Sequence, residues 1–283
     1  MTDDLPTTAV LGAGTMARAV VLGLLERAGG TIGEVRTTNH SRAGAARWAG
    51  QAGVVATAVE DDPDANRTAV AGADLVLLGV EPHGVVALLR EVSSAVAPDA
   101  TVVSLAAGVG LSVLAAELPA GVAIVRTAAN TPSLVGAGVT GLAATAGTDE
   151  TVRARVEQLF TALGEVLWVA EDDLHIVAAT SGSGPAYLYF VLEQFARAAA
   201  AQGLGADEAD RLARATFLGA AELLRVSGAE PGDLRRQVTS RGGSTERAIA
   251  VLDAGRVDLL LAEAMAAAIV RTREMGAEAA AQD

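Results

Sequence analysis

Apolar residues along the first 170 residues form short runs separated by amphipathic helical patterns. The runs are rich in Val, Leu and Ala, and they follow the continuous apolar pattern of strands that are buried on both faces. Helical spacing of apolar residues predicts helices at 85–92 and near 150–163. Buried strands that alternate with helices predict a doubly wound, mostly parallel sheet of the α/β class. The predicted strands lie at 8–11, 73–80, 101–108, 122–130 and 165–170.

The pattern changes after residue 170, where no strand is predicted and long Ala- and Leu-rich helical segments follow. We therefore predict two domains, residues 1–170 and an all-helical domain of residues 171–283. Segments 187–202 and 259–270 are apolar nearly all round, and a small monomeric domain could not cover both. This pattern predicts an intertwined homodimer through the C-terminal helices. The alternative is a single helical bundle packed on the first domain. The predicted helices span 183–202, 206–227, 244–254 and 256–275.

A glycine-rich turn follows the first predicted strand. Gly12-Ala13-Gly14 leads into a helix in which Met16, Val20 and Leu24 recur every fourth residue. Such glycines allow a tight turn and close approach of a pyrophosphate, and the helix N-terminus adds partial positive charge. We therefore predict that the first domain is a Rossmann-like dinucleotide-binding domain, followed by an all-α dimerisation domain. The alternative is a purely structural turn between strand and helix.

The next expected strand lies within residues 35–44, and the polar residues at its end indicate which dinucleotide binds. NAD-specific sites carry an Asp or Glu about 20 residues beyond the glycines, where it binds the ribose hydroxyls. The segment VRTTNHSRAG at 35–44 instead presents Asn39, His40, Ser41 and Arg42. Amide, hydroxyl and guanidinium donors suit a 2′-phosphate, so we predict NADPH as cofactor, with NADH also possible. The alternative is an ordinary solvated loop.

Ligands of doubly wound sheets bind outside the carboxyl ends of the strands. The residues at, or directly after, the carboxyl ends of the predicted strands 73–80, 101–108 and 122–130 are therefore expected to line the cofactor crevice. They are Val80, Glu81, Pro82, Ala106, Ala107, Gly108, Asn130, Thr131 and Pro132.

Composition excludes several kinds of chemistry. The 283 residues include no Cys, and the three His residues lie far apart, so we predict no metal site. With neither thiol nor His cluster, the demanding chemistry must come from a cofactor. A net charge of −13 without a basic block opposes binding to nucleic acid.

The chain also lacks the features of a membrane or exported protein. Its longest apolar runs are much shorter than the roughly 18 residues of a membrane span. The N-terminal segment MTDDLPTTAV carries acidic residues where a signal peptide carries basic ones. We therefore expect a cytoplasmic protein without a membrane partner.

The segment VTSRGGSTERAIAVLDAG at 238–255 places hydroxyls and glycines before a helix. We predict that Ser244 or Thr245 is the N-cap of this helix. Hydroxyl and N–H donors gathered at a helix N-terminus can hold a small carboxylate. No residue pair here can act as nucleophile and base, which disfavours a covalent mechanism. The alternative is that the two hydroxyls are only helix caps.

This segment and three others resemble the pyrroline-5-carboxylate reductase family. The others are VLGAGTMARAVVLGLL at 10–25, RTAANTPSLVGAG at 126–138 and TSGSGPAYLYFVLEQFARAAAAQGL at 180–204. Together they span almost the whole chain in the family's order. The resemblance implies a Rossmann domain joined to an interlocked helical dimer, often assembled into a decamer. It also implies hydride transfer from NAD(P)H to the C=N carbon of a cyclic imino acid, the last step of proline synthesis.

The resemblance also implies roles for individual residues. Thr245 matches the threonine that hydrogen-bonds the imine nitrogen and is the predicted catalytic residue. The residues that match the family's substrate loop are Ser240, Gly242, Gly243, Ser244 and Thr245, to which we add Arg241. Those that match or flank its cofactor site are Gly12, Ala13, Gly14, Thr15 and Met16 at the pyrophosphate, Asn39, Ser41 and Arg42 near the 2′-phosphate, and Val80, Pro82, Ala106, Ala107 and Asn130 toward the nicotinamide.

Three departures from the family pattern leave alternatives open. Arg241 replaces the usual Pro after Thr-Ser, Glu81 replaces a Lys, and Ala128-Ala129 replaces Met-Pro. A guanidinium beside the substrate loop can bind a carboxylate, so one alternative is a reductase of the same fold for a different cyclic or acyclic imine. Another is a dinucleotide-binding dimer without catalysis. A third alternative is that the departures are neutral drift at loop positions, with Arg241 in solvent.

Overall fold

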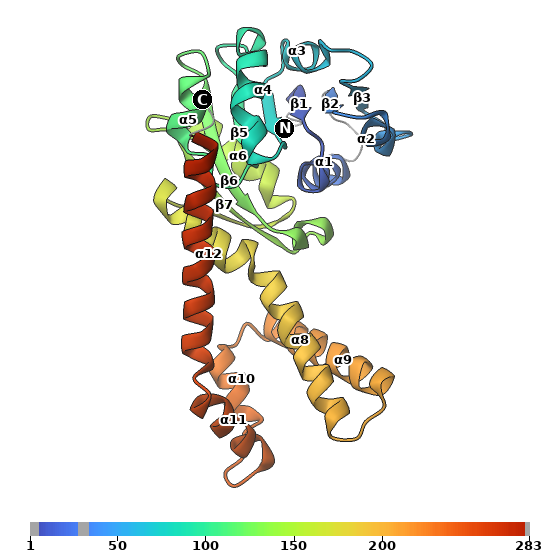
Figure 1. Ribbon diagram of the computed structural model, residues 1–283, viewed down its shortest axis with the longest axis vertical. Helices are drawn as coiled ribbons and strands as arrows, with labels where there is room; N and C mark the ends of the chain where they lie inside the picture. Colours follow the sequence, from blue (N-terminus) through green and yellow to red (C-terminus); the bar gives the residue numbers. More distant parts are fainter. Residues whose placement is uncertain (1–5, 28–33, 281–283) are drawn as a thin grey trace. The chain divides into compact units, whose positions relative to one another are not determined.

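The computed structural model describes residues 6–27 and 34–280, and these residues form two compact units. The first unit contains the described residues up to Ser183 together with those from Ala268 onward, and the second is Gly184–Ala267 (Figure 1). The predicted functional division at 170 and 171 rests on the sequence and stays a prediction. In the described ranges, no helix is long and apolar enough to cross a membrane.

The first unit is built on one eight-stranded sheet in the order β3-β2-β1-β4-β5-β6-β7-β8. All neighbouring pairs are parallel except β6 and β7. The chain thus winds outward from β1 in one direction and then, from β4, in the other, as the α/β prediction requires. The strands are β1 (Thr8–Leu11), β2 (Val35–Asn39), β3 (Val54–Ala58), β4 (Leu75–Leu78), β5 (Thr101–Ser104), β6 (Ala123–Ala129), β7 (Gly138–Ala144) and β8 (Gly164–Trp168).

Helices cover both faces of this sheet and form two separate cores. Alternate strand residues point to opposite faces, so Leu78 and Ile124 lie in one core and Leu77 and Val125 in the other. The second core is closed by the fully buried ring of Phe160. The helices over the first core are α3 (Ala65–Val70), α4 (Val85–Val92) and α5 (Leu111–Ala116), and those over the second are α1 (Thr15–Arg27) and α6 (Glu150–Thr161) (Figure 1). Val20 of α1 is buried and Met16 is partly buried, whereas the Leu24 side chain lies outside the described part.

Two strands were not expected from the sequence. β3 is short and partly exposed, and β7 contains two glycines and runs antiparallel to β6. Neither has the continuous apolar run that identifies a buried parallel strand. The other strands were predicted. The prediction agrees with β1, whereas the paired parts of β4, β5, β6 and β8 are shorter than the predicted runs. For example, the run at 73–80 pairs only over β4, because the chain turns away after Gly79.

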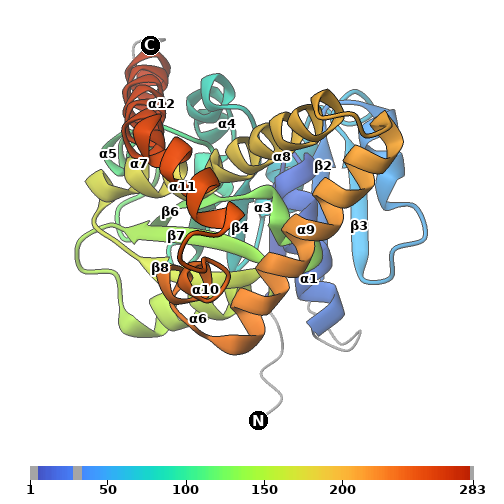
Figure 2. The ribbon, with the colours of Figure 1, turned by 90° about the horizontal axis from the view of Figure 1, so that it is seen from below.

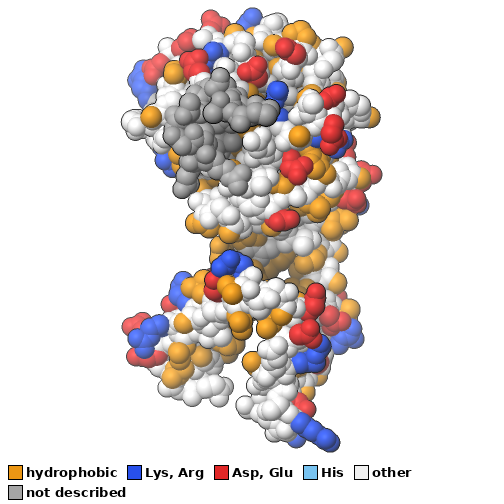
Figure 3. All heavy atoms as spheres, turned by 180° about the vertical axis from the view of Figure 1, so that it is seen from behind, with side chains coloured by type: hydrophobic (Ala, Val, Ile, Leu, Met, Phe, Trp, Pro, Cys, Tyr) orange, Lys and Arg blue, Asp and Glu red, His pale blue; other side chains and the backbone are white. Residues whose placement is uncertain are grey.

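The second unit is helical, and the described residues from 171 onward contain no strand, as predicted. The helices α8 and α9 pack against each other (Figure 2). The rings of Phe195 and Phe217 meet edge to face between them, at 5.7 Å between centroids. Many large apolar side chains of this unit are exposed (Figure 3). The unit contains α8 (Gly184–Ala201), α9 (Ala206–Ser227), α10 (Pro231–Gln237), α11 (Ser244–Ala254) and the start of α12 (Val257–Ala280); α10 was not predicted.

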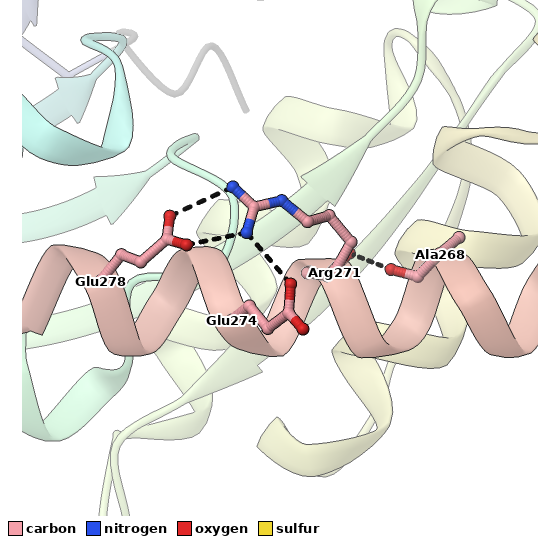
Figure 4. Close-up of polar contacts among 5 residues, drawn as sticks. Ala268, Arg271, Glu274 and Glu278 are labelled. Atoms are coloured by element: carbon pink, nitrogen blue, oxygen red, sulfur yellow. Dashed lines mark hydrogen bonds and ion pairs between the residues drawn. The ribbon is translucent and has the colours of Figure 1, made fainter.

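The second half of α12 belongs to the first unit. A Cβ on Gly108 would lie 2.9 Å from the Gly276 nitrogen, so helix and loop meet backbone to backbone. The positive φ of Gly108, 83°, also requires glycine there. On the exposed side, Arg271 forms ion pairs with Glu274 and Glu278, which support this stretch of helix (Figure 4).

Candidate functional site

The carboxyl ends of five strands lie in one row. Leu11 of β1 pairs with Thr38 and Leu78, Leu78 pairs with Ser104, and Ser104 pairs with Arg126. The loops that leave these strands therefore start at one edge of the sheet. The strand order reverses between β1 and β4, which is where doubly wound sheets bind their ligands.

The glycine-rich turn lies at this reversal. Gly12 has a φ of 75°, and a Cβ on it would overlap Val80. A Cβ on Gly79 would in turn overlap Gly12 and lie 2.7 Å from the Ala17 methyl group. Gly12 is therefore required by the fold, and Ala17 must stay small because α1 packs closely on the end of β4.

Gly14 differs, because a Cβ on it would find no protein atom closer than 3.8 Å. The fold leaves this position open on the exposed side of the turn. Helix α1 begins at the next residue, Thr15, and its first turn contains no acidic residue that would neutralise the free N–H groups. An exposed, uncompensated helix N-terminus beside an open glycine fits the pyrophosphate of a dinucleotide.

The end of β2 lies beside this turn. The Asn39 amide donates to the Ala13 carbonyl oxygen at 3.2 Å, and its own oxygen is buried with no partner in the described part. Ser41 is the N-cap of α2 (Arg42–Ala45) and accepts from the Gly44 N–H at 3.2 Å. Asn39 thus joins the two loops, and its unsatisfied oxygen is available to a ligand donor.

Arg42 has partners that the sequence did not indicate. Its side chain donates to Asp61 at 2.5 Å, and its backbone N–H donates to Glu60 at 2.6 Å. Both carboxylates follow β3, the strand that was not predicted, so their position next to the β2 end was also missed. Arg42 and Asp61 also line an open hollow of about 420 Å³ beside Trp48.

The ends of β4 and β5 present mainly small groups. Pro82 opens a short helical turn, η2 (Pro82–Gly84), and is partly buried with Val80. Ala106 is buried, and its N–H donates to the Ser104 hydroxyl at 3.3 Å, whereas Ala107 is exposed. Apart from the exposed Glu81 and His83, the side chains here are small, so a bound ring would meet mainly backbone and apolar groups.

Asn130 is held by the protein itself. Its amide nitrogen donates to the Ser181 carbonyl oxygen at 3.0 Å, and its oxygen accepts from the Val139 N–H at 2.8 Å. The residue is buried and ties the end of β6 to β7 and to the π-helical turn η6 (Ala178–Gly182). Its predicted place near the nicotinamide stays a prediction, and its side chain has a structural task as well.

An ion pair braces the loop between β5 and α5. Arg126 of β6 is buried and donates to the Glu171 carboxylate at 2.5 Å. The same oxygen accepts from the N–H of Leu111, the first residue of α5, at 2.6 Å. Near this pair, burial foremost, and also the charges of Arg126 and Arg273, lower the pKa of His175 below its ordinary value. Glu171 and His175 were not singled out from the sequence.

The hydroxyl-rich loop lies in the second unit, between α10 and α11. The Gly243 N–H donates to the Ser240 carbonyl oxygen at 3.0 Å and closes a tight turn in which Gly242 has a φ of 74°. A Cβ on Gly243 would lie 2.6 Å from the Ser240 hydroxyl oxygen. Both glycines are therefore needed to form this turn.

The N-cap prediction for this helix was wrong. The N-cap is Gly243, and α11 begins at Ser244. The Glu246 carboxylate reaches back and accepts from the Gly242 N–H at 2.8 Å, one residue before the N-cap. This bond fixes the loop, and no side chain caps α11, so the hydroxyls of Ser244 and Thr245 are not used as caps.

The loop offers neutral donors at the start of an eleven-residue helix. Thr245 is partly buried, whereas Ser240, Arg241 and Ser244 are exposed. The first N–H groups of α11 have no intrahelical acceptor, and with the hydroxyls they can hold a carboxylate. The loop contains no base beside a nucleophile, and no group of three potential metal ligands occurs among the described residues. The arrangement can bind and orient a substrate.

Comparison with known proteins places this geometry in context. Residues 7–108 match the family described as NADP oxidoreductase, coenzyme F420-dependent. Residues 171–275 match the family described as pyrroline-5-carboxylate reductase dimerisation. The second match confirms the prediction that the C-terminal helices form a dimerisation domain.

Similar proteins match nearly the whole chain. Pyrroline-5-carboxylate reductase of Pseudomonas aeruginosa is 35% identical over 271 residues, which are 95% of this chain and 97% of that protein. The structure of a pyrroline-5-carboxylate reductase from Coxiella burnetii has a TM-score of 0.87 at 35% identity, covering 96% of this chain and 99% of that one. The Plasmodium falciparum pyrroline carboxylate reductase, solved with NADP bound, shares the fold with a TM-score of 0.80 at 22% identity over 98% and 99% of the two chains.

The dinucleotide turn at the sheet edge, the hydroxyl loop before α11 and these matches along the chain's length lead to one conclusion. The chain belongs to the pyrroline-5-carboxylate reductase family.

Proposed function

We propose that this protein reduces the C=N bond of 1-pyrroline-5-carboxylate to L-proline with NADPH, the last step of proline biosynthesis; NADH is the alternative donor. The observation that carries the proposal is the presence, in one chain of this family, of a dinucleotide turn and a free hydroxyl loop at a helix N-terminus.

The nicotinamide cofactor supplies a hydride when bound. The chain's own residues hold it: we assign the pyrophosphate to Gly12, Ala13, Gly14, Thr15 and Met16, the 2′-phosphate to Asn39, Ser41 and Arg42, and the nicotinamide half to Val80, Pro82, Ala106, Ala107 and Asn130. The open surroundings of Gly14 support the pyrophosphate assignment. The orphan oxygen of Asn39 is an acceptor, so it suits a ribose hydroxyl beside the 2′-phosphate rather than the phosphate itself. The match of residues 7–108 to an NADP oxidoreductase family supports the choice of NADPH.

The loop of residues 240–245 holds the substrate in this proposal. The N–H groups of Ser244 and Thr245 and the neighbouring hydroxyls bind the ring carboxylate, and Thr245 hydrogen-bonds the imine nitrogen. The carbon of a protonated imine is already electrophilic, so alignment and a fitted polar environment suffice for its reduction. The substrate arrives with its proton or takes it from water, and no side chain has to act as a general acid.

We propose an intertwined dimer as the working unit, with a decamer as the larger assembly. The exposed apolar side chains of α8 and α9 support the dimer, because a lone chain would leave them in water. The cytoplasm stays our prediction for its location.

One observation favours a second candidate function. Arg241 lies in the substrate loop, is exposed and has no hydrogen bond or ion pair within the described ranges. A free guanidinium can bind a carboxylate or another acceptor on a larger substrate. The second candidate is therefore the reduction of a different imine by the same loop and cofactor.

The test is NADPH oxidation by the purified protein with pyrroline-5-carboxylate and its six-membered analogue, piperideine carboxylate, assayed in parallel. We expect the five-membered substrate to have the higher kcat/KM. Faster reduction of another imine would replace the substrate assignment and direct attention to Arg241. Tight NADPH binding with no turnover of any imine would support a binding protein without catalysis.

A further inference from the structure

The side chain of Arg42 is already engaged by acidic residues at the proposed 2′-phosphate site. Its Nε and Nη2 atoms each lie 2.5 Å from one Asp61 oxygen. The Glu60 carboxylate accepts from the Arg42 backbone N–H at 2.6 Å and lies 3.9 Å from Nε. Two carboxylates therefore surround one guanidinium, and the local formal charge is −1.

This arrangement is built into the backbone. The Val59 N–H donates to the Asn39 carbonyl oxygen at 2.9 Å, and the Glu60 N–H donates to the His40 carbonyl oxygen at 3.2 Å. The loop after β3 thus runs along the loop after β2. These backbone bonds place Glu60 and Asp61 beside Arg42 and do not depend on the conformation of the Arg42 side chain.

We propose that Glu60 and Asp61 set the cofactor preference by holding Arg42 and opposing the 2′-phosphate. This inference rests on the proposed binding of NADPH at the end of β2. A 2′-phosphate and Asp61 compete for the same guanidinium, because one Asp61 oxygen already occupies its Nε and Nη2 donors. When the phosphate takes Arg42, both carboxylates stay beside a dianion. A ribose with a free 2′-hydroxyl meets no such repulsion. Glu60 and Asp61 therefore reduce the difference in binding affinity between NADPH and NADH.

The experiment measures equilibrium binding of 2′,5′-ADP and 5′-AMP by calorimetry at low salt, without any imine. These two probes differ by the 2′-phosphate alone. The variants are Glu60→Gln and Asp61→Asn, which keep an oxygen acceptor and remove one charge. The control is Asp64→Asn, because Asp64 is an exposed carboxylate nearby in sequence that forms no hydrogen bond or ion pair with Arg42 in the described part of the chain.

Each test variant is expected to raise the affinity for 2′,5′-ADP relative to 5′-AMP by about three- to tenfold, the effect of one charge near the protein surface. Asp64→Asn should change the ratio by less than about twofold, and 0.5 M salt should shrink the gain. Arg42→Ala should lower 2′,5′-ADP binding and leave 5′-AMP binding nearly unchanged.

An unchanged ratio in both test variants overturns the inference, as does an Asp64→Asn effect of equal size. Failure of both probes and of NADP⁺ and NAD⁺ to bind also overturns it. Because no imine is present, a wrong substrate assignment leaves these results untouched. Thermal unfolding of each variant identifies any that has lost its fold.

Discussion

Gly12 and Gly14 are two residues of one motif with different reasons to be glycine. Gly12 combines a φ of 75° with overlap of any Cβ on Val80, so the fold itself requires it. Gly14 has no positive φ and has open surroundings, so the fold does not require glycine there, and in the proposed site its small size admits the pyrophosphate.

We expect Gly12→Ala to lower the free energy of unfolding by about 1–3 kcal/mol, the cost of a strained backbone position. Gly14→Ala should leave the free energy of unfolding within about 0.5 kcal/mol of the parent and should weaken NADPH binding at least about tenfold. Urea unfolding and fluorescence titration with NADPH measure the two effects. Equal NADPH affinity in Gly14→Ala and the parent would contradict placement of the pyrophosphate there.

Thr245 is the residue on which the proposed chemistry depends most. Its hydroxyl makes no hydrogen bond in the described part of the chain, and no side chain caps α11. We expect Thr245→Ala to lower kcat about a hundredfold, the loss typical of a donor aimed at the reacting group. Stopped-flow kinetics with the imine and NADPH titration measure turnover and binding separately.

Thr245→Ser keeps the hydroxyl and is the matched control, with kcat expected within about tenfold of the parent. NADPH affinity should be nearly the same in all three proteins. Unchanged turnover in Thr245→Ala would remove this residue from the mechanism.

At the scale of elements, α7 (Leu174–Val177) places His175 near the charges of Arg126 on β6 and Arg273 on α12. Burial is the main cause that lowers the pKa of His175 below 6.5, and Arg126 and Arg273 add to it, whereas Asp172 and Glu171 oppose it. The unfolded chain therefore binds more protons than the folded one at pH values below about 6.5. The folded state should lose stability as the pH falls from about 6.5 toward 5.

His175→Gln is expected to flatten this part of the stability profile, measured by urea unfolding at closely spaced pH values. His83→Gln is the matched control, because His83 is exposed in η2 and away from this contact. If the stability of His175→Gln falls with pH as steeply as that of the parent, the titrating group lies elsewhere.

The helix boundaries were predicted well where the apolar period is regular, and a glycine, Gly228 or Gly255, directly follows two of these helices. The expected helices at 85–92, 206–227 and 244–254 agree with α4, α9 and α11. The strands β3 and β7 were missed because their residues are half-exposed or small and take their place only through pairing with β2 and β6. Because β3 was not predicted, the sequence did not indicate that Glu60 and Asp61, which follow it, lie beside the proposed 2′-phosphate site.

At the scale of the whole molecule, the second unit leaves apolar side chains exposed on several sides of α8. Leu188, Tyr189 and Phe190 are 62%, 59% and 60% exposed. Three consecutive residues cover more than half the circumference of a helix, because each step turns the chain by about 100°. Packing within a single chain therefore does not cover this helix, and a partner subunit must.

We expect Phe190→Asp to weaken the homodimer at least about tenfold, because a charge replaces an apolar side chain within the interface. Sedimentation velocity over a range of protein concentrations measures the dissociation constant. Ala154→Asp on α6 introduces the same charge at an exposed helix position of the first unit and should leave the dimer intact. Equal dissociation constants for both variants and the parent would show that α8 lies outside the interface.

The sequence by itself determined the α/β class, the dinucleotide turn and the helical dimerisation domain. These depend on local periodicity and on glycine at positions where the backbone admits no other residue, both of which are written in neighbouring residues. Only the tertiary structure decided which polar groups are free. It places Asn130 in a bridge from the end of β6 to β7, and it engages Arg42 with two carboxylates from the loop after β3. It also leaves the Thr245 hydroxyl free, because the N-cap of α11 is Gly243. A residue's partners depend on chain segments brought together by pairing and packing, and spacing along the sequence does not contain that information.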